Sequence, residues 1–276
     1  MPSVGGRSIA ITELGPGTPV LMLHGFGNDH RSLLYALEPV FERRPGYRRI
    51  HVDLPGFGAS PADPAIDSSD AMVEFVLELI DEVIGVERFL LVGQSWGAYL
   101  ARSVVARRRP QVIGVALVIP VVVARHADRD VPAHRILLEE PGVLEGVGPI
   151  AAAAFREGAV IIDPASWDYF RTTIQPSMAV ADEDVLERIG ARYAFANDVD
   201  SLGAPFDGPS LIVAGRQDSV VGYRDAQRLL ERFPRSTFAV LDVAGHNLEG
   251  ERTGLLRALV DDWLDRVELD VPTGFV

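Results

Sequence analysis

The stretch 88-RFLLVGQSWGAYLARSVV-105 decides the fold of this chain. An apolar run leads into Gly93-Gln94-Ser95-Trp96-Gly97, and a helix-like run over 98–105 follows. A strand, a G-x-S-x-G turn and a helix in that order form a nucleophile elbow, in which the serine takes a strained backbone conformation. Glycine on both sides removes the Cβ atoms that would otherwise collide. We therefore expect Ser95 Oγ to stand clear of the sheet, at a helix start that favours developing negative charge.

A serine nucleophile needs a base, and the base needs an orienting acid. Of the six histidines, His246 is the one that follows a late strand-like run, 237–241, in a glycine-rich loop. Asp218 follows the apolar run 210–215, which is typical of a buried parallel strand. Asp242 is a weaker candidate for the acid, because it leads directly into the histidine loop. The predicted catalytic residues are therefore Ser95, Asp218 and His246, in the chain order of an α/β-hydrolase triad.

On these residues the chain resembles the α/β-hydrolase fold superfamily over nearly its whole length. The resemblance is carried by His24-Gly25-Phe26-Gly27 after the strand 20–23, by the segment 53-DLPGFGAS-60, by the elbow, and by the two loops with Asp218 and His246. It implies a serine hydrolase with a helical cap and no cofactor. It also implies an oxyanion hole made by the backbone N–H groups of Phe26 and Trp96.

Other polar residues in these segments are interpreted as structural. The turn that begins at Asp53 is the family's structural turn. His24 is a hydrogen-bonded loop histidine, and His51 belongs to the strand 48–53.

The expected fold class is α/β, a mostly parallel central sheet flanked by helices, because strand-like and helix-like segments alternate. Strands are predicted near 9–14, 20–23, 48–53, 88–93, 112–119, 210–215 and 237–242, and helices near 70–84, 96–108 and 248–266. Residues 121–204 interrupt the alternation and are too long for a simple loop. The predicted organisation is a hydrolase core, 1–120 and 205–276, with a helical cap, 121–204.

Within the predicted cap, Asp163 and Pro164 favour one helix start, and 181–189 favours a second helix. Trp167, Tyr169 and Phe170 are predicted either to fill the core of the cap or to line the substrate pocket.

Basic residues gather at the entrance to the cap, among them Arg125. A salt-bridged hinge is the simpler interpretation of this cluster. The alternative is that one arginine of the cluster, Arg125, Arg129 or Arg135, faces the pocket and holds a substrate carboxylate in a bidentate pair, and Arg125 is the one named as a pocket residue.

Composition narrows the function classes. A formal net charge of −13 argues against a nucleic-acid partner and disfavours an anionic membrane surface. The chain has no cysteine, and all of its basic residues apart from histidine are arginine, which excludes thiol chemistry, a Schiff-base lysine and a Walker-type P-loop. No metal-ligand spacing is present. Without a secretory signal pattern, a cytoplasmic protein is expected.

The predicted function is hydrolysis of a small or medium carboxylic ester through an acyl-enzyme. Hydrolysis of a carbon–carbon bond, a lactone or a peptide with the same triad is the alternative within enzymes. A non-catalytic ligand-binding protein on this fold is the alternative of another class. The expected partner is a small-molecule substrate, and formation of a homo-oligomer is left open.

Overall fold

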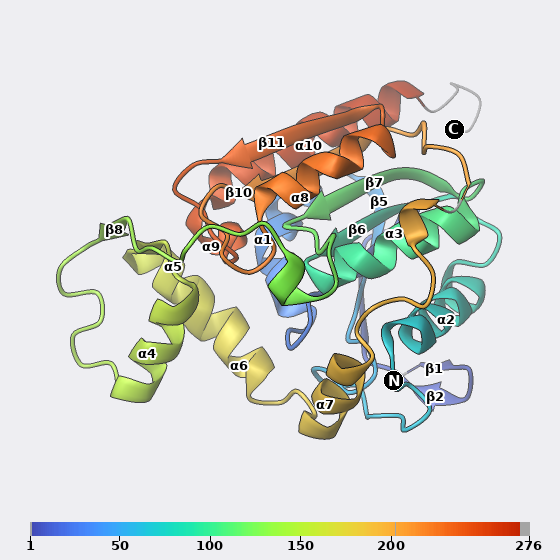
Figure 1. Ribbon diagram of the computed structural model, residues 1–276. Coiled ribbons are helices and arrows are strands. Elements are labelled where there is room, and N and C mark those ends of the chain that lie inside the picture. The colour runs from blue at the N-terminus through green and yellow to red at the C-terminus, as the bar shows by residue number, and fades with distance from the viewer. Residues whose placement is uncertain (1, 202, 271–276) are drawn as a thin grey trace.

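A seven-stranded sheet forms the centre of the protein (Figure 1). The computed structural model describes residues 2–201 and 203–270. The strands are β3 (Ile11–Leu14), β4 (Gly17–Leu23), β5 (Gly46–Val52), β6 (Phe89–Gln94), β7 (Val112–Val118), β10 (Ser210–Gly215) and β11 (Ser236–Leu241). Their spatial order is β11-β10-β7-β6-β4-β5-β3, and β3 pairs antiparallel with β5 while the other neighbours are parallel. The mostly parallel sheet predicted from the sequence is therefore confirmed.

The register brings the carboxyl ends of the central strands to one edge. Every residue of β6 and of β10 is buried, as expected for parallel strands covered on both faces. Gly93 is level with Leu23 of β4, and Gln94 is level with Val118 of β7. Ligands of open α/β sheets bind outside this edge, so the chain segments that leave these strands are the ones that can build a site.

Helices cover both faces of the sheet (Figure 1). They are α1 (Arg31–Phe41), α2 (Ser69–Leu79), α3 (Trp96–Arg108), α8 (Tyr223–Gln227), α9 (Leu248–Glu251) and α10 (Thr253–Asp270). Helix α1 packs against α10, and α2 packs against α3, as one pair on each face. No helix in the described ranges is both long enough and apolar enough to cross a membrane.

The chain between β7 and β10 forms a largely helical segment beside the sheet (Figure 1). It contains β8 (Leu138–Glu139), α4 (Pro149–Gly158), β9 (Ile161–Ile162), α5 (Pro164–Tyr169), α6 (Gln175–Met178) and α7 (Glu183–Ala191). Helix α5 begins as the sequence predicts, because the Asp163 side chain accepts a hydrogen bond from Ser166 N and Pro164 is the first helical residue. The segment has a small apolar core of its own around Phe155 and Phe170.

Some elements differ from the sequence prediction. The helix expected over 248–266 is two helices, because Arg252 between them leaves the helical conformation with φ −130°. The helix expected over 70–84 ends at Leu79 and continues as a π-helical turn, Ile80–Ile84. A short antiparallel hairpin, β1 (Ser3–Val4) and β2 (Arg7–Ser8), precedes the sheet.

Candidate active site

The turn between β6 and α3 holds Ser95 in a conformation that residues with a Cβ rarely adopt. Ser95 has φ 53° and ψ −113°. A Cβ on Gly97 would collide with the carbonyl oxygen of Leu23, so glycine is required there. The peptide of Ser95 is fixed from both sides, because its N–H donates to Val118 O (2.9 Å) and its carbonyl accepts from Val121 N (3.1 Å). The elbow predicted from the sequence thus has a rigid, strained backbone.

The structure brings the three predicted catalytic residues together. Ser95 Oγ lies 3.1 Å from His246 Nε2, and His246 Nδ1 lies 3.0 Å from Asp218 Oδ2. The other Asp218 oxygen accepts hydrogen bonds from Val220 N (2.8 Å) and Val221 N (3.0 Å). Asp218 is buried, while the His246 side chain is 22% exposed and can be reached from outside. This chain of contacts has the geometry that a nucleophile, a base and an orienting acid would need.

Charges around His246 set its protonation. Burial lowers its pKa, but the adjacent Asp218 and its hydrogen bond outweigh burial, and the pKa of His246 is raised above 6.5. Glu249 adds to this rise, and Arg129 opposes it. Burial raises the pKa of Asp218, but the contact with His246 and the two backbone N–H groups lower it by more. The net pKa is below 3.8, so Asp218 is ionised at neutral pH.

The alternative acid, Asp242, lies elsewhere. Its exposed side chain accepts a hydrogen bond from Gln217 Nε2 (2.8 Å). Asp218 is the carboxylate that contacts His246.

The two predicted oxyanion donors lie on either side of Ser95. Trp96 is the first residue of α3, and a Cβ on Gly25, the residue before Phe26, would lie 3.2 Å from Ser95 Cβ. Gly25 N in turn donates to Gln94 Oε1 (2.8 Å), so the elbow itself fixes this loop. Within the described residues neither the Phe26 N–H nor the Trp96 N–H donates a hydrogen bond. Both are therefore available for an oxyanion.

Glu249 is a buried carboxylic acid close to the triad that the sequence analysis missed. It has no exposed surface, and neither of its side-chain oxygens has a hydrogen-bond partner in the described part of the chain. Burial raises its pKa to about 7, although its own backbone N–H, the neighbouring His246 and the Gln94 amide act in the opposite direction; the N–H and the amide approach the carboxyl group without completing a hydrogen bond. The ring of Tyr169 covers the next residue, Gly250. Its position three residues after His246 is the one signal for Glu249 in the sequence.

The other polar residues of the predicted segments are held in structural roles. His24 Nδ1 donates to Gly25 O (2.8 Å) and Nε2 accepts from Leu54 N (3.0 Å), which fixes one neutral tautomer. Burial lowers the pKa of His24 and keeps it neutral. His51 is buried in β5, where Nε2 lies 2.9 Å from Glu38 Oε1.

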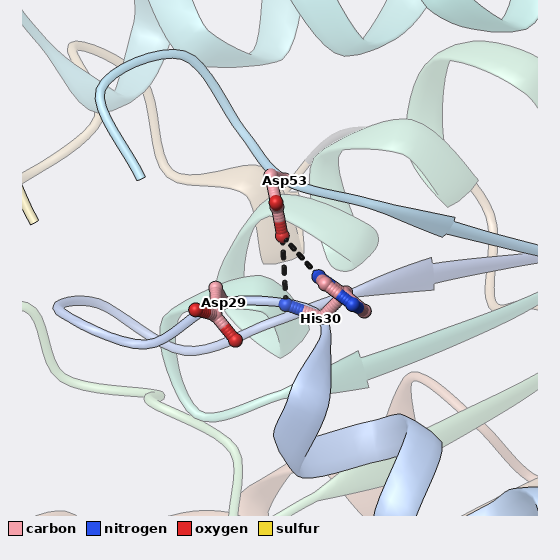
Figure 2. Close-up of side chains that lie close together, drawn as sticks. All are labelled: Asp29, His30 and Asp53. Atoms are coloured by element: carbon pink, nitrogen blue, oxygen red, sulfur yellow. Dashed lines mark hydrogen bonds and ion pairs between the residues drawn. The ribbon is translucent and has the colours of Figure 1, made fainter. Parts of the chain in front are cut away.

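Asp29, His30 and Asp53 gather next to the sheet edge, as Figure 2 shows. Asp53 Oδ1 accepts from His30 N (3.0 Å) and from His30 Nδ1 (2.6 Å), and Oδ2 accepts from Ala59 N (2.9 Å). Asp29 Oδ1 accepts from Arg31 N, and Oδ2 lies 3.0 Å from Arg31 Nη1. Because protein groups already engage these oxygens, we assign the cluster to the structural turn.

A pocket of about 420 Å³ opens between the two ends of the inserted segment. It is lined by Ala124, Arg125, His126, Arg129, Gly190, Ala191, Tyr193 and Ala194. Arg125, one of the residues predicted to line a pocket, lines this one.

The predicted aromatic pocket residues pack elsewhere in the described structure. The rings of Trp167 and Phe170 pack on Phe155, with centroid distances of 5.3 and 5.1 Å, in the core of the inserted segment. Tyr169 is buried against Tyr35, 5.1 Å between ring centroids.

Comparisons with known proteins agree with this fold. The model of a family described as the alpha/beta hydrolase family matches residues 20–258. The crystal structure of an alpha/beta superfamily hydrolase from Oenococcus oeni PSU-1 superposes with a TM-score of 0.88 at 30% identity and covers 96% of this chain and 98% of that one.

Curated relatives are more distant or match in part. A putative carbamate hydrolase, RutD, from Agrobacterium fabrum is 26% identical over 82% of this chain and 85% of its own length. Epoxide hydrolase 2 from Siraitia grosvenorii is 37% identical over 36% of this chain, and the match spans 31% of that enzyme.

Proposed function

The chain belongs to the alpha/beta hydrolase family, and on that premise we propose that it hydrolyses small or medium carboxylic esters through a serine nucleophile. The observation that carries this proposal is the placement of Ser95 Oγ, on a strained turn, 3.1 Å from His246 Nε2. An esterified carboxyl group is the simplest substrate that such a nucleophile attacks.

In the proposed reaction, His246 Nε2 takes the proton of Ser95 Oγ as the oxygen bonds to the acyl carbon. Asp218 keeps the second proton on Nδ1 and stabilises the imidazolium that forms. The carbonyl oxygen becomes an oxyanion, which the N–H groups of Phe26 and Trp96 bind. His246 then gives its proton to the departing alcohol, and the acyl-enzyme remains.

A water molecule completes the cycle. His246 removes a proton from the water as the water oxygen attacks the acyl carbon, and Ser95 Oγ leaves with that proton. These residues supply nucleophile, base and oxyanion donors, so the proposed reaction calls for no cofactor.

The inserted segment, residues 121–204, is proposed to act as a cap. Helix α5 packs against α9, which begins two residues after His246. Tyr193, near the end of the segment, packs its ring against Phe26 and Trp96. The segment thus reaches both sides of the proposed site.

Labelling with a fluorophosphonate tests the nucleophile. The adduct should map to Ser95 and should disappear in Ser95→Ala, while Ser103→Ala, in the helix α3 that follows Ser95, should keep it. Labelling that persists in Ser95→Ala contradicts the assignment. Turnover of p-nitrophenyl esters of graded acyl length tests whether the substrate is an ester, and this turnover should be lost in Ser95→Ala. A labelled but inactive protein would favour a lactone or carbon–carbon substrate, and a protein that is neither labelled nor active would favour a ligand-binding role.

A further inference from the structure

The 420 Å³ pocket is basic in a chain that is strongly acidic overall. Its side chains include Arg125, His126 and Arg129, and no acidic residue of the described chain lines it, although the full sequence carries a formal net charge of −13. The remaining lining residues are small or aromatic. Its volume is in the range of pockets that hold small organic ligands.

Arg129 is the arginine of this pocket that has no carboxylate partner among the described residues. Nε donates to Val123 O (2.7 Å), Nη1 to Val220 O (2.9 Å) and Nη2 to Ala124 O (2.7 Å). These acceptors are neutral carbonyls, so they hold the guanidinium in place without cancelling its charge. A guanidinium has five N–H donors, and carbonyls take three of them here, so each terminal nitrogen keeps one N–H for the Tyr193 hydroxyl or for a ligand. Two parallel N–H groups match the two oxygens of a carboxylate.

Arg125 differs in this respect. Its guanidinium pairs through two nitrogens with the two Asp128 oxygens, at 2.6 and 2.7 Å, and its side chain is 76% exposed. Arg125, which was predicted from the sequence as a pocket residue, therefore has its charge already paired with Asp128.

Two contacts link the pocket to the proposed catalytic residues, although none of those residues lines it. Val220, whose carbonyl holds Arg129, donates its N–H to Asp218. The Tyr193 hydroxyl lies beside the Arg129 guanidinium, and the Tyr193 ring packs on Phe26 with a centroid distance of 5.5 Å. One side chain therefore lines the pocket and contacts the residue whose N–H is proposed to bind the oxyanion.

We propose that this pocket binds a carboxylate on the substrate, with Arg129 as the anion-binding residue and the Tyr193 hydroxyl as a further donor. The substrate class is then an ester that also bears a free carboxylate, such as a half-ester of a short dicarboxylic acid. That the bound carboxylate belongs to a substrate rests on the proposed ester hydrolysis. The pocket itself can be tested by binding alone.

Binding is measured by calorimetry on the full chain carrying Ser95→Ala, so that no turnover occurs. The ligands are monobutyl succinate, an anion, and butyl methyl succinate, its neutral counterpart. The anion should bind at least about tenfold more tightly, the scale of hydrogen bonds to a charged group. This ratio should fall towards one with Arg129→Gln and remain in a control, Arg135→Gln, because Arg135 does not line the pocket.

Arg129 also holds three backbone carbonyls, so Arg129→Gln changes local structure as well as charge. Variants at a second residue of the pocket wall therefore separate the two effects. Ala191 is exposed and lines the pocket. Ala191→Glu should abolish the preference for the anion by repulsion, whereas the uncharged Ala191→Gln should keep it.

Equal affinity for the two ligands in the parent overturns the inference, as does a preference that survives both Arg129→Gln and Ala191→Glu. Either result leaves fluorophosphonate labelling of Ser95 unaffected. Conversely, absent labelling refutes the proposed function and leaves the binding ratio intact.

Discussion

Replacing Glu249 by glutamine should stabilise the folded protein at neutral and alkaline pH. The folded environment raises the pKa of this carboxyl from 4.5 to about 7, mainly by burial, and neither of its oxygens has a hydrogen-bond partner within the described chain. Between these two pKa values the folded protein binds a proton that the unfolded chain has lost. Stability therefore falls as the pH rises through this window and stays reduced above it.

The size of the effect follows from the shift. Each pKa unit corresponds to about 1.36 kcal/mol, so a rise from 4.5 to about 7 costs the folded state roughly 3 kcal/mol above pH 7. Most of this cost should appear between about pH 5 and pH 8. Glutamine has nearly the same shape and carries no charge, so Glu249→Gln should remove it.

Urea unfolding near pH 5 and near pH 8 gives the two free energies for each variant. The matched control is Glu251→Gln, two residues further on. Glu251 is also buried, but its oxygens accept hydrogen bonds from the backbone N–H groups of Gly245, Val160 and Ile161. Its replacement should therefore destabilise the protein at both pH values.

The reasoning is refuted if Glu249→Gln is no more stable than the parent near pH 8. It is refuted as well if the gain is the same at both pH values, because a gain independent of pH would come from packing and not from ionisation.

Further changes test the site and its support. Asp218→Asn should lower kcat on esters by about 10⁴-fold, the scale of lost tautomer control, while Asp242→Asn should change it less than about tenfold; the reverse order would assign the acid to Asp242. On the acid side of its pH profile, kcat/KM should be half-lost at a pH above 6.5, because the base must be unprotonated and the pKa of His246 is raised. A midpoint below 6.5 would contradict this sign. Gly97→Ala should abolish activity or folding, measured by turnover and circular dichroism, because its Cβ meets a carbonyl oxygen. Phe170→Ala should lower the free energy of unfolding by about 3 kcal/mol in urea titrations, since the ring fills the core of the inserted segment.

The sequence predicted best where a local pattern has one structural solution. The glycines around Ser95 permit the elbow conformation. The apolar run before Asp218 is the buried strand β10, and the run before His246 is its parallel, half-buried neighbour β11. A strand that ends at the carboxyl edge delivers its next side chain to that edge, so chain order alone predicted that the three residues meet.

What the sequence did not predict depends on contacts between distant segments. Gln94 at the end of β6 accepts a hydrogen bond from Gly25, which follows the neighbouring strand β4. The absence of a hydrogen-bond partner for Glu249 within the described chain depends on what packs around it. Arg125 and Arg129 look alike in the sequence. Only the fold shows that Arg125 pairs with Asp128 while Arg129 donates to backbone carbonyls. The break at Arg252 has no clear signal in the residues around it.

The hydrogen bonds that Ser95 makes to Val118 and Val121 have a consequence for protein engineering. They tie the nucleophile to the short piece of chain through which the core passes into the inserted segment. A chimera that grafts another enzyme's insertion onto this core should therefore keep the host residues through Val121 and join the donor sequence after them. A junction placed earlier would exchange part of the support of the nucleophile along with the insertion.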